Sequence, residues 1–154
     1  MLNTTTPVST GVLQAIEVID LSKAKTRLMA PVPQGKGWSF EKVQVAEKFY
    51  RRFLVLAVKH PKAKLIPNVL VDELWHQHVL DTRQYPKDCN RVFGGFMHHD
   101  PYFGTTSEGE QQLPVLFAET NRLFCAEFGE NCITAEPMAE LLQAAKSCNG
   151  GGDD

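Results

Sequence analysis

Long apolar runs are largely missing from this 154-residue sequence. The longest extends only from Phe53 to Val58 and is bounded by Arg52 and Lys59, whereas a helix needs about 20 apolar residues to cross a bilayer. The N-terminal stretch MLNTTTPVSTG also lacks the basic start and apolar core of a secretory signal. We therefore expect no membrane-spanning segment and a cytoplasmic location.

Paired cysteines are absent, and the cysteine spacing matches neither a zinc motif nor a disulfide framework. None of the cysteines forms a CxxC pair. The four are Cys89, Cys125, Cys132 and Cys148. In a reducing compartment such residues are most simply free thiols, and we expect Cys125 to fill the core.

The chain also lacks an excess of either charge. It has 16 basic and 18 acidic residues and a net charge of −2, whereas nucleic-acid-binding domains usually carry a strongly basic face. Arg51, Arg52 and the lysines within 59–64 form a local basic cluster, which we interpret as a solvated helix end and loop. Gly94-Gly95 is followed by a loop and not by a helix, so it does not indicate a phosphate-binding motif. Nucleic acid is therefore not an expected partner, whereas a protein partner is compatible with the sequence.

Sustained period-two alternation, the pattern of a half-buried strand, is absent as well. We predict an all-α fold, a single-domain bundle of five to six helices with an ordered His-containing loop. Residues 1–9 are expected to be flexible, residues 10–148 to form the helical domain, and residues 149–154 to be a disordered polar tail. The first two helices are predicted over 12–28 and over 40–59, the second with Ser39 as N-cap. A third starts at Pro67 or Asn68 and contains the WHQH tetrad, and a fourth covers about 82–93. The last two are predicted over about 108–128, with a bend or restart at Pro114, and over 135–148.

Residues 71–104 hold four of the five histidines and are the segment on which a functional prediction depends. In a regular helix Asp72 and His76 share one face, whereas His76 and His78 point to nearly opposite sides. A metal bound by both histidines would require the helix to unwind after Trp75. Two simpler interpretations remain open: His78 packs in the core against Trp75, and His76 pairs with Asp72 one turn earlier.

The accumulation of imidazoles nevertheless favours a metal site. Burying several histidines without a cation costs desolvation, and a divalent metal would accept their lone pairs while nearby carboxylates orient the rings. His76, His78 and His99 are the preferred ligands, with Asp72, His98 and Cys89 in reserve. Imidazole with carboxylate suits iron or zinc. A nucleophilic pair of Cys89 with His98 or His99 is a further alternative.

The same segment resembles the glycine-rich domain-containing protein-like family, a helical domain of plants, fungi and bacteria. The family pattern V-D-x-x-W-H-x-H, followed by Tyr and a later His-containing element, is matched here over about thirty residues. The matching residues are Val71-Asp72, Trp75-His76-Gln77-His78, Tyr85, Asp88-Cys89, Phe93-Gly94 and the run from His98 to Gly104. The resemblance implies a stand-alone helical domain and favours His99 over His98. Plant members carry glycine-rich and RNA-binding regions that this chain does not share.

Two functional hypotheses follow from these residues. The first is a small cytoplasmic helical protein with a His-rich metal site and, if it is an enzyme, a redox or hydrolytic reaction. The second is a non-catalytic protein-interaction or scaffold domain, in which the histidines and Trp75 form a structural core. A structural metal without chemistry is the third possibility.

Overall fold

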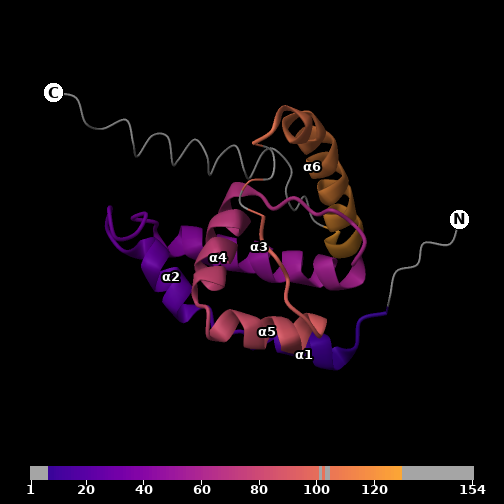
Figure 1. The fold of residues 1–154 in the computed structure, drawn as a ribbon. Helices are drawn as coiled ribbons and strands as arrows, with labels where there is room; N and C mark the ends of the chain where they lie inside the picture. The colour runs from indigo at the N-terminus through magenta and orange to yellow at the C-terminus, as the bar shows by residue number, and fades with distance from the viewer. Residues whose placement is uncertain (1–6, 101, 103–104, 130–154) are drawn as a thin grey trace, which may run out of the picture.

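The computed structural model describes residues 7–100, 102 and 105–129. Within these residues the chain forms six helices and no strand, which confirms the predicted all-α, single-domain fold. The helices are α1 (Thr10–Glu17), α2 (Ser22–Met29), α3 (Phe40–Lys59), α4 (Val69–Leu80), α5 (Gln84–Phe93) and α6 (Ser107–Phe128). Figure 1 shows α3 at the centre of the molecule, with α4 crossing it and α5 lying beside α1.

The single helix predicted over 12–28 is wrong, because the chain breaks into α1 and α2. Asp20 accounts for the break, since its carboxylate accepts hydrogen bonds from both the backbone N–H and the hydroxyl of Ser22. Such local bonds compete with the helical pattern and start a new helix. The two short helices then bury Ile16 and Leu28 against the same core.

The long helix α3 supplies the central part of the core. Ser39 caps it as predicted, accepting a hydrogen bond from the backbone N–H of Lys42. Apolar side chains at three- and four-residue spacing give the helix a continuous buried face. Its buried residues are Val43, Ala46, Tyr50, Phe53, Leu54 and Leu56. Because α3 contacts α1, α2, α4 and α6, it fixes where the other helices lie.

Helices α4 and α5 form the part of the bundle that carries the His-rich segment. Asn68 caps α4 by accepting a hydrogen bond from the backbone N–H of Val71, which confirms the predicted start. Gly94 ends α5 as predicted, because its φ of 70° lies in the left-handed region that favours glycine. The chain then leaves α5 as the loop 94–100 and passes back along α4 (Figure 1).

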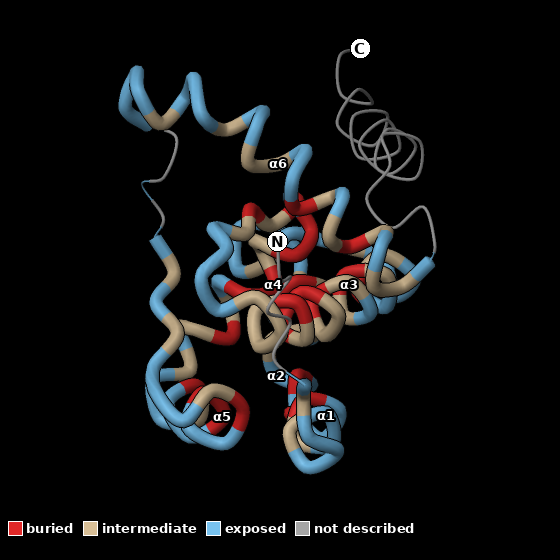
Figure 2. Tube along the Cα trace, turned by 90° about the vertical axis from the view of Figure 1, so that its right-hand side faces the viewer, coloured by how far each residue is buried: buried red, intermediate tan, exposed pale blue. Residues whose placement is uncertain are grey.

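Helix α6 is attached to the bundle mainly through its C-terminal half. It runs through Pro114 without interruption and packs on α3 through Phe124, whose ring lies 5.9 Å from that of Phe49. Thr120 adds a buried hydrogen bond, in which its hydroxyl accepts the backbone N–H of Ile66. Figure 2 shows the first turns of α6 exposed and its buried residues close to the bundle.

Several predictions fall outside the described residues. These are the flexible residues 1–6, the helix over 135–148, the polar tail over 149–154 and the two C-terminal cysteines. Within the described part of the chain, none of the helices is long and apolar enough to cross a membrane.

Candidate functional site

The loop 94–100 is held in place by the phenol of Tyr85. This hydroxyl accepts a hydrogen bond from Trp75 Nε1 at 2.9 Å and donates one to the carbonyl oxygen of Met97 at 2.5 Å. Tyr85 and Trp75 are both buried, so the bond between them forms away from competing water, and the bond to Met97 is partly buried. One side chain of α5 thereby connects α4 to the loop and brings His99 back to α4.

His78 is a satisfied core residue, 4% exposed, whose two ring nitrogens both have protein partners. Nδ1 lies 2.7 Å from the hydroxyl of Tyr50, and Nε2 lies 2.8 Å from Oδ2 of Asp88. An ionised carboxylate only accepts hydrogen bonds, so Nε2 carries the proton and Nδ1 accepts from Tyr50. The other carboxylate oxygen of Asp88 accepts a bond from Gln84. The network therefore joins α3, α4 and α5 and leaves no lone pair of His78 for a metal.

Burial controls the titration of this network. It lowers the pKa of His78, because desolvation disfavours the imidazolium more than the hydrogen bond to Asp88 favours it. The pKa of Tyr50 is raised well above its ordinary value, first by burial and then by the nearby Tyr85 and Cys89. Both directions keep the side chains neutral near pH 7, which matches a structural role.

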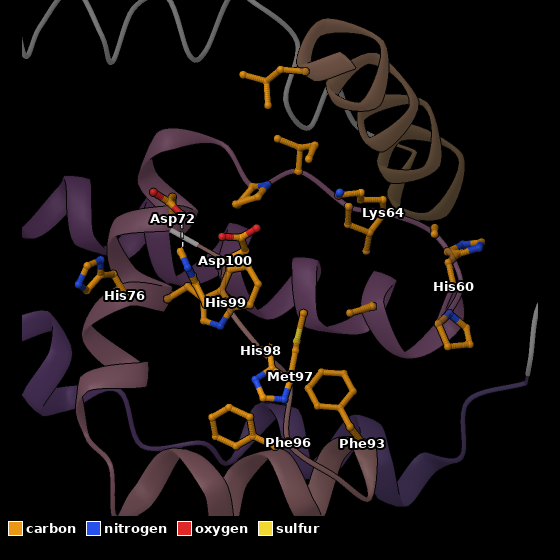
Figure 3. Close-up of a pocket in the computed structure, with 18 of the residues that line it drawn as sticks. His60, Lys64, Asp72, His76, Phe93, Phe96, Met97, His98, His99 and Asp100 are labelled. Carbon is orange, nitrogen blue, oxygen red and sulfur yellow. Dashed lines mark hydrogen bonds and ion pairs between the residues drawn. The ribbon is translucent and has the colours of Figure 1, made fainter. Parts of the chain in front are cut away.

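A second cluster lies on the other side of α4. Asp72 and His76 are one helical turn apart, and His99 Nε2 lies 2.7 Å from Asp72 Oδ1. The ring of His99 packs edge-on against Trp75, with centroids 4.3 Å apart, and its centroid is 6.0 Å from that of His76. Asp72 therefore pairs with His99 from the loop, and not with His76 as one interpretation proposed. Figure 3 shows the pair joined by a dashed line, with the ring of His76 turned away from it.

This cluster borders a pocket of about 760 Å³. Its walls come from the end of α3, the connection to α4, α4 itself, the last residue of α5, the loop after it and one residue of α6. Four of the five histidines line it, together with three aromatic residues: His60, His76, His98, His99, Trp75, Phe93 and Phe96. Figure 3 places Asp72, Asp100 and His99 toward one side of the pocket and His60 and Lys64 toward the other.

The structure brings together only part of the predicted ligand set. Asp72 and His99 are in contact with His76 nearby, whereas His78 is held in the core by Tyr50 and Asp88. Among the described residues no three histidine, cysteine or acidic side chains already form a metal-binding group.

The two remaining candidates lie elsewhere. His98 is exposed in the loop, where its ring packs against Phe96 at 4.7 Å, and it lines the pocket. Cys89 is a free thiol in the core, 3% exposed, and it interacts with Tyr85. A thiol so deeply buried does not suit the proposed Cys–His nucleophile, which needs access to substrate.

Sequence reasoning missed Tyr50 and His60. Tyr50 reads as one more apolar position in the 3–4 pattern of α3, and only its contact with His78 reveals a polar role. His60 is isolated in the sequence and reaches the pocket because the chain turns after α3. Tyr85 and Asp88 belong to the residues that carry the family resemblance, but nothing in the sequence indicated that they support different histidines.

The fold and site define a small all-α domain with a histidine-lined pocket next to a buried polar network. The chain belongs to the UCP032817-like family, whose model matches residues 16–127. The family name specifies no activity, substrate or metal, and the match gives no support to the glycine-rich domain name. No curated protein and no solved structure matches the chain.

Proposed function

We propose that the protein binds a divalent metal through Asp72, His76 and His99, at the edge of the pocket. The observation that carries this proposal is the convergence of the donors: one helical face supplies Asp72 and His76, and the loop brings His99 into contact with Asp72. Two imidazoles and one carboxylate suit ferrous iron or zinc. The set differs from the sequence-based one, because His78 is committed to the core.

The spacing of Asp72 and His99 is compatible with a shared metal ion. Two ligands that are each about 2.1 Å from a metal lie about 3.0 to 3.4 Å apart, depending on the angle between them. Asp72 Oδ1 and His99 Nε2 are 2.7 Å apart, so the ion would widen this pair slightly and replace its hydrogen bond. His76 is exposed and would have to rotate about its side-chain bonds to turn its ring toward the ion.

Such a site would leave coordination positions for water or a substrate next to the pocket. A metal with open positions supports hydrolysis by activating bound water, or redox chemistry if the ion is iron. We accordingly propose a metal-dependent redox or hydrolytic activity in this pocket. We also propose a cytoplasmic location, which the free thiol of Cys89 supports.

Metal titration of protein purified without a His tag tests the proposal. We expect zinc or cobalt(II) to bind at one equivalent, and His76→Ala, His99→Ala and Asp72→Asn each to lower the affinity by at least about tenfold. His60→Ala and His98→Ala are matched controls, because both side chains line the pocket outside the cluster. Equal affinity in all five variants, or no stoichiometric binding, would contradict the proposed site.

A non-catalytic interaction or scaffold domain is the second candidate, and the satisfied network of His78 and Trp75 favours it. Under this alternative the histidines act only in packing and hydrogen bonding, and the exposed loop would contact a protein partner. Metal binding would then be absent, while loss of the partly buried His99 would still reduce stability by roughly 1–3 kcal/mol. Elemental analysis and urea unfolding of the same variants therefore separate the two functions.

A further inference from the structure

The pocket beside the proposed metal site has the size of a small-molecule site. Its volume of about 760 Å³ lies within the range of about 300 to 1,000 Å³ that is usual for ligand pockets. Such pockets combine apolar walls with a few polar groups that orient the ligand. Here the polar groups include the Asp72–His99 pair and His76, and the apolar walls combine aliphatic side chains with the aromatic residues Trp75, Phe93 and Phe96.

The aromatic wall is partly free to contact a ligand. Phe96 lines the pocket and is 49% exposed, although its ring already packs edge-on against Tyr85 at 5.3 Å. Trp75 also lines the pocket but is only 6% exposed, with the ring of His99 against it, so Phe96 offers more aromatic surface to a ligand. A half-exposed phenylalanine in a pocket favours a planar aromatic group, because aromatic pairs gain both apolar contact and edge-to-face attraction.

The ion selects the head group of the ligand. A divalent ion held by Asp72, His76 and His99 would keep open coordination positions next to the pocket. Carboxylate and hydroxamate oxygens are ligands that can occupy such positions. The proposed ion therefore favours an oxyanion as the head group.

We infer that the pocket binds a small aromatic oxyanion, such as an aromatic carboxylate or hydroxamate, with its oxygen atoms on the metal and its ring against Phe96. The inference rests on the proposed metal site and names the class of ligand that the site would take. It also predicts that the ring and the head group make separate contributions to the binding affinity, because they contact different parts of the pocket.

Two hydroxamates of different tail size test this inference on the cobalt(II)-loaded protein. Benzohydroxamic acid and acetohydroxamic acid share the same metal-binding head, and only the former carries a ring. We expect both to shift the visible cobalt(II) bands. The ratio of their dissociation constants should favour benzohydroxamic acid about tenfold more on the protein than on free cobalt(II). Phe96→Ala should remove most of that preference. Phe40→Ala, which changes an exposed aromatic residue outside the pocket, should retain it.

Ala57→Leu provides a second variant that keeps the aromatic wall. Ala57 lines the pocket from α3, so a larger side chain there should reduce the preference for benzohydroxamic acid without weakening cobalt binding. If cobalt(II) does not bind, the metal site and the inference fail together. If cobalt(II) binds but the two hydroxamates keep the ratio measured for the free ion, only the inference is overturned. A preference that survives in Phe96→Ala likewise overturns it.

Discussion

At the scale of single residues, neighbouring histidines of one helix have different tasks. His78 has both ring nitrogens bonded and is almost fully buried, whereas His76, two positions earlier, is exposed at the pocket. The helical turn of about 100° per residue sends the two side chains in nearly opposite directions. The two histidines of the HxH sequence therefore have separate roles, His78 in the core and His76 in the proposed metal site, and they do not bind one metal together.

His78→Gln tests the structural half of this division. Glutamine cannot bond both Tyr50 and Asp88 in the geometry of an imidazole, so at least one buried group loses its partner. We expect the free energy of unfolding to fall by roughly 1–3 kcal/mol, measured by urea denaturation, with metal affinity unchanged. Gln77→Ala on the same helix is the control and should change stability by less than about 0.5 kcal/mol. A loss of metal binding in His78→Gln would contradict the assignment.

The lowered pKa of His78 predicts a dependence of stability on pH. In the unfolded chain the imidazole takes up a proton below its ordinary pKa of 6.5, while the folded protein keeps it neutral to a lower pH. The unfolded state then binds more protons, so the free energy of unfolding decreases as the pH falls below 6.5. Above that pH this contribution is fully present.

Urea midpoints measured in chelator at several pH values check this expectation. The wild type should lose more stability between about pH 7 and about pH 5 than His78→Gln does, because the other titrating groups are common to both proteins. If the urea midpoint changes equally with pH in the two proteins, His78 titrates alike in the folded and unfolded states.

At the scale of elements, the loop 94–100 determines whether the site exists. It begins at Gly94, where a left-handed backbone ends α5, and is held at Met97 by Tyr85. His99 follows two residues later and reaches Asp72. The geometry of the helix end therefore sets the path of the loop and, through it, the position of a proposed ligand.

Gly94→Ala and Gly95→Ala form a matched pair for this element. A Cβ at either position meets no atom within 4 Å, and of the two only Gly94 has a positive φ. We expect Gly94→Ala to lower the free energy of unfolding by about 1 kcal/mol, from the left-handed strain alone, while Gly95→Ala changes it little. Urea denaturation measures both. Equal losses would mean that the strain at Gly94 does not govern this helix end.

At the scale of the whole molecule, the described part of the chain buries two apolar clusters. The larger involves α1 to α5 and contains Trp75 and Tyr85, and the smaller joins Leu56 of α3 to Phe124 of α6. Because α6 contributes Leu113 to the pocket, its attachment through Phe124 also completes a wall of the proposed site. Core packing and site geometry are thus coupled across α3.

Phe124→Ala tests how strongly α6 is attached. The side chain is fully buried, so its truncation should cost about 3–5 kcal/mol in the free energy of unfolding. The substitution should speed amide hydrogen exchange more in α6 than in α4. Val115→Ala on the exposed face of the same helix should have little effect, since Val115 is 70% exposed. Unchanged exchange in α6 of the Phe124 variant would show that other contacts hold the helix.

The sequence by itself determined the elements whose signals are local. The 3–4 spacing of apolar residues, the cap at Ser39, the helix start near Asn68 and the stop at Gly94 act within a few residues, and each was confirmed in the structure. The break at Asp20 was missed, because two hydrogen bonds from Ser22 to the Asp20 carboxylate override an apolar pattern that continues through it. The shared face of Asp72 and His76 was equally readable, since helical geometry alone produces it.

Only the tertiary structure decided which partner each histidine takes. Tyr50 reaches His78 from 28 residues away, and His99 reaches Asp72 across 27. Such contacts depend on how whole helices pack and on where the loop after α5 is held, and no local pattern encodes them. For that reason the sequence located the segment that carries the chemistry, whereas the packing of α3, α4 and α5 separated the buried imidazole from the ones at the pocket.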